Sequence, residues 1–132
     1  MDGFQQLNMK IKTCKVPVVV ATQGYVFGGG CEISMHADAG VYAAESYIGL
    51  VEVGVGLIPG GGGTKELALR ASDKCFEGDV MMPTLIDAFQ TIATAKVSTS
   101  ASEAYDFGYL IEGKDFVETN LQRNIGEAKR KV

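Results

Sequence analysis

The feature that most constrains the fold is an apolar run that leads into a cluster of glycines and then into a helical pattern. Residues 16–21 read VPVVVA, residues 28–30 are three consecutive glycines, and Glu32 stands just inside the helical pattern of residues 30–37. β-Branched residues favour a strand, and glycines permit a tight turn before a helix. The first N–H groups of a helix lack intrahelical acceptors and can hold a developing negative charge. We therefore interpret this stretch as half of an active site.

Composition limits the classes of protein to which the chain can belong. Its 132 residues suffice for one domain with a core, and its net charge of −4 argues against a nucleic-acid surface. No apolar run is long enough to span a bilayer, and the N-terminus lacks the pattern of a signal peptide. The cysteines, Cys14, Cys31 and Cys75, form no CxxC pair. We therefore expect a cytoplasmic protein without disulfides, a metal site, nucleic-acid partners or membrane insertion.

Hydrophobic periodicity predicts an α/β chain. Phe4, Leu7 and Ile11 share one helical face, so an amphipathic helix is expected over residues 3–13. Further helices are predicted over residues 30–37, 64–71 and 82–96, from the capping-box pattern at 100–103 to Gly108, and after residues 119–122. Strands are predicted over residues 18–22, 39–43, 47–50 and 109–111. Only about three of these strands are convincing, against five or six helices, which falls short of the roughly four to six strands of a common sheet and indicates part of a larger domain.

Glu32 is the first candidate catalytic residue. It lies three residues after Gly29, about 300° around a helix, so the two face roughly the same side. Glycine lets a carbonyl approach the backbone, and an N–H donated to an oxyanion there is worth roughly 100- to 1,000-fold in rate. Beside a polarised carbonyl, Glu32 could act as a general base. It could equally cap its own helix, and these residues alone leave both interpretations open.

A second acid, Glu52, stands in the otherwise apolar and glycine-rich residues 48–59. A lone carboxylate in such a segment is costly unless it is paired or faces a site. One interpretation is an exposed loop residue. The other is a pair of carboxylates around one cavity, which would transfer protons at carbons next to a carbonyl.

Several short motifs together resemble one family. They are VPVVVA at residues 16–21, GGGCE at 28–32, AESYIG at 44–49 and GLIPGGGGT at 56–64. In combination they resemble the enoyl-CoA hydratase/isomerase (crotonase) family, and residues 100–110 resemble its helix and strand after the active site. The residues around Glu52 and the long helical pattern at 82–96 are most similar to the crotonase part of multifunctional fatty-acid oxidation proteins, which also carry a 3-hydroxyacyl-CoA dehydrogenase part.

The resemblance implies an activity and a role for each site residue. The activity is hydration of 2-enoyl-CoA thioesters in fatty-acid β-oxidation, with coenzyme A as part of the acyl-CoA substrate and no cofactor. Gly29 would donate to the thioester oxygen, Glu32 would activate the water that attacks the β-carbon, and Glu52 would exchange a proton at the α-carbon. The presence of both acids favours hydration over double-bond isomerisation. The implied substrate-binding residues are Gly28, Gly29, Val51, Pro59 and Gly60, although many family members have proline where this chain has Val51.

The first half of the family's domain has no counterpart in this sequence. That half supplies several strands, a second oxyanion donor and much of the coenzyme A pocket. The resemblance therefore implies a partial crotonase-type ββα spiral, the C-terminal half of the domain, over residues 1–132. Its expected parts are an active-site core at 15–71, a connection and long helix at 72–97, and a helical part at 98–132. The resemblance also implies trimer-based homo-oligomers and a fragment that is inactive alone. The alternatives are an isomerase or another enolate-stabilising acyl-CoA enzyme, and a non-catalytic fragment that serves assembly.

Other patterns in the chain point less strongly to chemistry. The glycines of residues 54–60 depart from the GxGxxG spacing of dinucleotide sites, and residues 60–65 lack the Gly-Lys-Ser/Thr order of a P-loop. His36, the only histidine, is interpreted as structural, and Cys31 as a packing residue.

Overall fold

The computed structural model describes residues 2–132 and contains two successive ββα turns. The first turn consists of β1 (Val19–Thr22), β2 (Tyr25–Phe27) and α2 (Gly29–His36). The second consists of β3 (Ala39–Ala43), β4 (Tyr47–Gly49), the 3-10 helix η1 (Glu52–Val55) and α3 (Gly63–Asp73). Each turn contributes one strand to each of two sheets. The predicted α/β spiral is confirmed.

Both sheets are built around parallel strands. In the first sheet, β3 pairs in parallel with β1 and with β6 (Asp115–Glu118), so that Val41 lies opposite both Ala21 and Phe116. In the second, β4 pairs in parallel with β2 and antiparallel with β5 (Val97–Ser98). Because α2 runs from a strand of the second sheet to a strand of the first, both of its ends are fixed by sheet structure.

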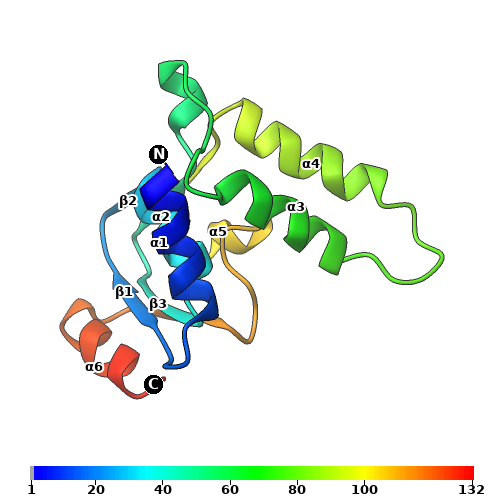
Figure 1. Ribbon diagram of the computed structural model, residues 1–132. Helices are drawn as coiled ribbons and strands as arrows, with labels where there is room; N and C mark the ends of the chain where they lie inside the picture. Colours follow the sequence, from blue (N-terminus) through cyan, green and yellow to red (C-terminus); the bar gives the residue numbers. More distant parts are fainter. Residues whose placement is uncertain (1) are drawn as a thin grey trace.

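The remaining helices surround this spiral (Figure 1): α1 (Asp2–Thr13), α4 (Met82–Ala93), α5 (Glu103–Asp106), the 3-10 helix η2 (Leu121–Arg123) and α6 (Asn124–Lys129). Helix α1 packs against α2, α3 packs against α4, and α6 lies over β1 and β3. The Asn124 side chain anchors α6, since its Nδ2 donates to the Thr22 carbonyl at 2.8 Å. Within residues 2–132, no helix combines the length and apolarity needed to cross a membrane.

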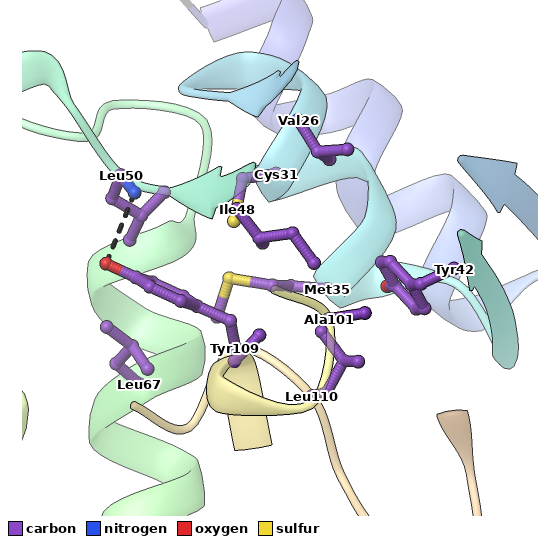
Figure 2. Packing of buried hydrophobic residues seen from close by; sticks show 11 residues of the cluster. Val26, Cys31, Met35, Tyr42, Ile48, Leu50, Leu67, Ala101, Tyr109 and Leu110 are labelled. Atoms are coloured by element: carbon purple, nitrogen blue, oxygen red, sulfur yellow. Dashed lines mark hydrogen bonds between the residues drawn. The ribbon is translucent and has the colours of Figure 1, made fainter. Parts of the chain in front are cut away.

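The hydrophobic core joins α2, the strands β2, β3 and β4, α3 and the segment around α5 (Figure 2). Cys31 and Met35 enter it from α2, and Leu67 enters it from α3. The Tyr109 hydroxyl accepts from the Leu50 N–H at 3.3 Å and donates to the Lys96 carbonyl at 2.7 Å. The core therefore holds the chain just before Glu52 in a fixed relation to α2.

The predicted strand at residues 109–111 is wrong. The buried Arg70 side chain donates to the Gly108 and Tyr109 carbonyl oxygens at 2.9 and 2.7 Å, which occupies acceptors that a strand would use. The strand of this region forms later, as β6. The prediction also lacked β2 and β5, which are only 3 and 2 residues long and too short for an alternating pattern to be visible.

The predicted helix at residues 3–13 is confirmed, but its predicted inward face is partly wrong. Leu7 is 47% exposed, whereas Asn8 is completely buried. The reason is the partner of the helix. Helix α1 lies over backbone carbonyl groups of residues 60 and 61, so amide side chains face inward.

Candidate active site

The turn between β2 and α2 presents N–H groups at the start of a helix. Gly28 caps α2 with a φ of 53° and a ψ of −122°, a conformation that glycine adopts most readily. Its own N–H donates to the Gly49 carbonyl at 2.9 Å, which fixes the turn against β4. The Gly29 N–H has no backbone acceptor among residues 2–132. The helix dipole adds partial positive charge at this end, so the Gly29 N–H is suited to an oxyanion.

Glu32 is buried and held by the glycine segment, residues 60–63. One carboxyl oxygen, Oε1, accepts from the N–H groups of Gly61 and Gly63, both at 2.9 Å. A Cβ at Gly61 would overlap the second oxygen of Glu32 and the Phe4 ring. Glu32 lies in the first turn of α2, where the helix dipole favours an acid, but the hydrogen bonds of its carboxyl group go to the glycine segment. A Cβ at Gly63 would lie 2.9 Å from the Leu50 side chain and 3.1 Å from Glu32 Cγ, so a side chain at Gly61 or Gly63 would crowd Glu32.

Glu52 begins η1 and is half-buried beside the Gly28 turn. A Cβ built at Gly28 would lie 3.0 Å from Glu52 Oε1, so the carboxyl group lies directly against this glycine. The other oxygen, Oε2, is buried and has no hydrogen-bond partner among residues 2–132. Burial raises the pKa of Glu52, and the negative charge of Glu32 raises it further. Glu52 therefore retains its proton to a higher pH than an ordinary glutamate.

The two acids and the α2 N-terminus belong to one site. Glu32 extends from α2 itself, and Glu52 lies against the residue that precedes Gly29. The pKa of Glu52 is raised mainly by burial, and the nearby charge of Glu32 acts in the same direction. An N–H that polarises a carbonyl, together with two carboxyl groups in reach of each other's field, can perform proton transfer next to that carbonyl.

The other residues predicted to bind substrate lie on the segments that carry Glu52 or hold Glu32. Val51 precedes Glu52 and is half-buried, Pro59 is buried, and Gly60 is half-buried. The Pro59 carbonyl accepts from the Thr64 hydroxyl at 3.0 Å, and the Gly60 carbonyl accepts from Gln5 Nε2 at 2.6 Å. Contact of these residues with substrate stays a prediction.

Sequence reasoning missed the polar residues of α1 that face the glycine segment. Asn8 Nδ2 donates to the Gly61 carbonyl at 2.7 Å, and Lys12 Nζ donates to the buried Glu66 carboxylate at 2.5 Å. Burial would raise the pKa of Glu66, but the hydrogen bonds from Lys12 and Lys65 outweigh it and leave that pKa lowered. The signal that could have predicted this face is the helical spacing of three polar residues, Gln5, Asn8 and Lys12.

His36 and Cys31 lie within the protein interior. His36 Nδ1 is 2.7 Å from the Glu32 carbonyl, one turn earlier in α2, and Nε2 is 3.5 Å from Glu66 Oε1. Burial lowers the pKa of His36 and raises that of the Cys31 thiol far above its ordinary value. These contacts fit the predicted structural and packing roles. Among residues 2–132, no group of three or more His, Cys, Asp and Glu side chains is arranged to hold a metal ion.

Solved structures of similar fold include two enoyl-CoA hydratases. The chain matches an enoyl-CoA hydratase from Polaromonas sp. JS666 with a TM-score of 0.72 and 22% identity, over 98% of this chain and 44% of that one. It matches an enoyl-CoA hydratase from Bacillus anthracis with a TM-score of 0.70 and 24% identity, over 98% of this chain and 45% of that one. At such identities the likeness concerns the fold.

Sequence comparison identifies the family. A probable 3-hydroxyacyl-CoA dehydrogenase from Bacillus subtilis is 44% identical over 127 residues, which are 96% of this chain and 16% of that protein. A crotonyl-CoA hydratase from Syntrophomonas wolfei is 40% identical over 63 residues, 48% of this chain and 24% of that protein. The chain thus spans a quarter or less of these relatives' lengths. A sequence model described as enoyl-CoA hydratase/isomerase matches residues 1–97, and the chain belongs to the enoyl-CoA hydratase/isomerase family.

Proposed function

We propose that this chain forms one side of the active site of an enoyl-CoA hydratase, which adds water across the double bond of 2-enoyl-CoA thioesters in fatty-acid β-oxidation. The observation that carries this proposal is the placement of the Glu52 carboxyl group, whose Oε1 lies against the Gly28 turn and whose buried Oε2 has no hydrogen-bond partner among residues 2–132. A buried polar atom without a partner costs free energy, and such costs are concentrated at functional sites. The names of the relatives from Syntrophomonas wolfei and Bacillus subtilis, a hydratase and a dehydrogenase of acyl-CoA substrates, support the same chemistry.

In the proposed reaction the Gly29 N–H donates to the thioester oxygen, which becomes negative as the β-carbon is attacked. Glu32 orients the water, takes one of its protons and leaves the oxygen to bond with the β-carbon. Glu52 gives its proton to the α-carbon, which suits a carboxyl group whose pKa is raised. The product carries the hydroxyl group and one added hydrogen. Since Glu32 ends protonated and Glu52 ionised, a proton must return from Glu32 to Glu52 before the next turnover.

The remaining substrate contacts follow from the same placement. Gly28, Val51, Pro59 and Gly60 are proposed to contact the acyl-CoA, because they lie next to Gly29, next to Glu52 or in the segment that leads to the Glu32 hydrogen bonds. Coenzyme A enters as part of the substrate, and the proposed chemistry needs no further cofactor. Since the chain spans only 44% of the Polaromonas hydratase, we infer that other segments supply the second oxyanion donor and much of the coenzyme A pocket. Residues 15–71 would then be the catalytic part of this half, and the isolated chain would not turn over.

We also infer a connection to oxidation of the product. Hydration yields a 3-hydroxyacyl thioester, the substrate class of a 3-hydroxyacyl-CoA dehydrogenase. The Bacillus subtilis relative is named as a probable enzyme of this kind and matches this chain over only 16% of its own length. A dehydrogenase part in the full-length protein is therefore proposed. Trimer-based assembly remains a prediction from the family resemblance, and a cytoplasmic location remains a prediction from the cysteine pattern and the N-terminal sequence.

The test compares crotonyl-CoA hydration by the 132-residue chain and by the protein expressed with its complete coding sequence. We expect turnover only in the second, and Glu32→Gln and Glu52→Gln should each lower kcat by roughly 100- to 10,000-fold. The matched control is Glu45→Gln, since Glu45 is an exposed acid in the turn between β3 and β4.

Two results would redirect the proposal. Turnover by the isolated chain would refute the inference that other segments are required. Conversion of a 3-enoyl to a 2-enoyl thioester that survives Glu32→Gln but not Glu52→Gln would identify an isomerase, because that reaction needs only the acid at the α-carbon.

A further inference from the structure

Helix α1 carries a polar stripe along the face that covers the glycine segment. Gln5, Asn8 and Lys12 follow one another at spacings of three and four, so they share one side of the helix. Gln5 Nε2 donates to the Gly60 carbonyl at 2.6 Å, and Asn8 Nδ2 donates to the Gly61 carbonyl at 2.7 Å. Figure 1 shows α1, in dark blue, beside α2, which carries Glu32.

These bonds lie one peptide group away from the Glu32 carboxylate. The peptide group that joins residues 60 and 61 accepts from Gln5 at its oxygen and donates to Glu32 Oε1 through the Gly61 N–H. The peptide group that joins residues 62 and 63 is held in the same way. Its oxygen accepts from the Glu66 N–H at 2.9 Å, and its N–H, on Gly63, donates to Glu32 Oε1. Asn8 holds the oxygen of the peptide group between these two.

Glycine peptides need this support. Each glycine has more backbone freedom than any other residue, and Gly62 has a φ of +111°. A peptide N–H can fix the orientation of a carboxylate only if the orientation of the peptide plane is itself fixed. Donation to the carbonyl of a peptide also strengthens the bond that its N–H makes.

Asn8 has an arrangement that packing alone does not explain. It is completely buried, and its Oδ1 has no partner among residues 2–132. A buried amide oxygen without a partner costs free energy that an apolar side chain of similar size would not incur. The hydrogen bond from Asn8 Nδ2 to the Gly61 carbonyl offsets this cost, and an apolar side chain could not form it.

We propose that Gln5 and Asn8 are positioning residues for Glu32, which act through the peptide groups of the glycine segment. The part of the proposal that concerns catalysis rests on the proposed function of Glu32. The hydrogen-bonded path from α1 to the carboxylate can be tested without any turnover.

Gln5→Leu is the informative substitution, because Gln5 is exposed and its loss leaves the core intact. The matched control is Gln6→Leu, since Gln6 is the exposed neighbour and bonds only to Asp2, at 3.3 Å. In the 132-residue chain we expect Gln5→Leu to accelerate hydrogen exchange of the Gly61 amide about fivefold, as loss of one hydrogen bond implies. The amide proton resonance of Gly61 should also shift. Gln6→Leu should change neither the exchange rate nor the resonance of the Gly61 amide. Asn8→Leu should act in the same direction as Gln5→Leu.

Turnover then gives a second measurement, in the protein expressed with its complete coding sequence. Gln5→Leu should lower kcat about five- to tenfold and leave KM within about twofold, because orientation and not substrate binding is lost. Gln5→Lys restores an N–H donor and should recover most of kcat, which a merely structural role of the side chain would not produce.

The two proposals fail in different ways. An unchanged Gly61 amide and unchanged kcat in Gln5→Leu would overturn the positioning role, even if hydration is established. A changed Gly61 amide in a protein that does not hydrate enoyl-CoA would support the hydrogen-bonded path and refute the proposed function.

Discussion

Replacement of Gly61 by alanine should disturb the candidate site at the glycine segment that holds Glu32. The methyl group would overlap Glu32 Oε2 and the Phe4 ring, so at least one of them must move. Glu32 is 2% exposed and receives two N–H groups, which leaves its carboxyl group little room. Phe4 also lies close to Gly29, where a built Cβ would be 3.2 Å from the ring. Any movement of Phe4 therefore reaches the N-terminus of α2.

The magnitude follows from these contacts. Overpacking a well-filled interior costs about 1–3 kcal/mol. Displacement of Glu32 would weaken hydrogen bonds to a charged group, which are worth about 1.5–3 kcal/mol each. Because one displacement causes both losses, they do not add fully, and we expect the free energy of unfolding to fall by about 2–4 kcal/mol. The backbone itself is not strained, since Gly61 is not among the glycines with positive φ.

Urea unfolding of the 132-residue chain, followed by circular dichroism, measures this loss as a lower midpoint at an unchanged slope. The matched control is Gly54→Ala. A Cβ at Gly54 would meet only the Ala95 Cβ, at an ordinary 3.6 Å, so a change within about 0.5 kcal/mol is expected. A loss for Gly61→Ala no larger than that of the control would refute the tight packing of the glycine segment on Glu32.

Two further predictions concern pH. Burial raises the pKa of Glu52 above its ordinary 4.5, so the folded protein binds this proton more tightly and loses stability as pH rises from 4.5 through the raised value. Glu52→Gln lacks this titration and should be more stable than wild type at pH 7, with a difference in unfolding free energy that closes toward pH 4.5 in urea titrations; a difference that does not change with pH would contradict this. For Glu66, burial raises the pKa, but hydrogen bonds from Lys12 and Lys65 outweigh burial and leave the pKa lowered. The ionised carboxylate therefore stabilises the folded protein above pH 4.5, and this stabilisation is lost as pH falls through the lowered pKa. Glu66→Gln should therefore be less stable than wild type at pH 7 and should approach it in acid, and a constant gap between the two would contradict this assignment.

The parts of the site that the sequence predicts correctly are those with a local cause. An apolar run, three glycines and a helical pattern lead to β1, the Gly28 turn and α2, because the positive φ of Gly28 needs glycine. Glu52 was identified as a candidate from its chemistry and not from periodicity, because a carboxylate among apolar residues is costly unless it is paired or faces a site. In the structure Glu52 Oε1 lies against Gly28, and Oε2 is buried without a hydrogen-bond partner among residues 2–132.

The inward face of α1 could not be predicted, because hydrophobic periodicity assumes an apolar partner. The partner here is the backbone of the glycine segment, which offers carbonyl oxygens and favours amide side chains such as Asn8. The predicted strand at residues 109–111 is wrong for a related reason. Their apolar character resembles a strand, but the carbonyls that a strand would use are taken by Arg70, 39 residues earlier in the chain from Tyr109. A single long-range donor of this kind leaves no trace in local sequence.

The two acids of the site differ in what the fold gives them, and this difference bears on mechanism. Glu32 receives two N–H groups from a glycine segment that α1 holds in turn, so its direction is fixed. Glu52 receives none at Oε2 and has a raised pKa because burial disfavours its charge. A fixed acceptor suits the residue that must aim a water molecule, and a carboxyl group that keeps its proton suits the residue that must deliver one to carbon. The hydrogen bonds of the two acids thus support the proposed roles, which the family resemblance implies, and exchange of the two environments would be expected to exchange the roles.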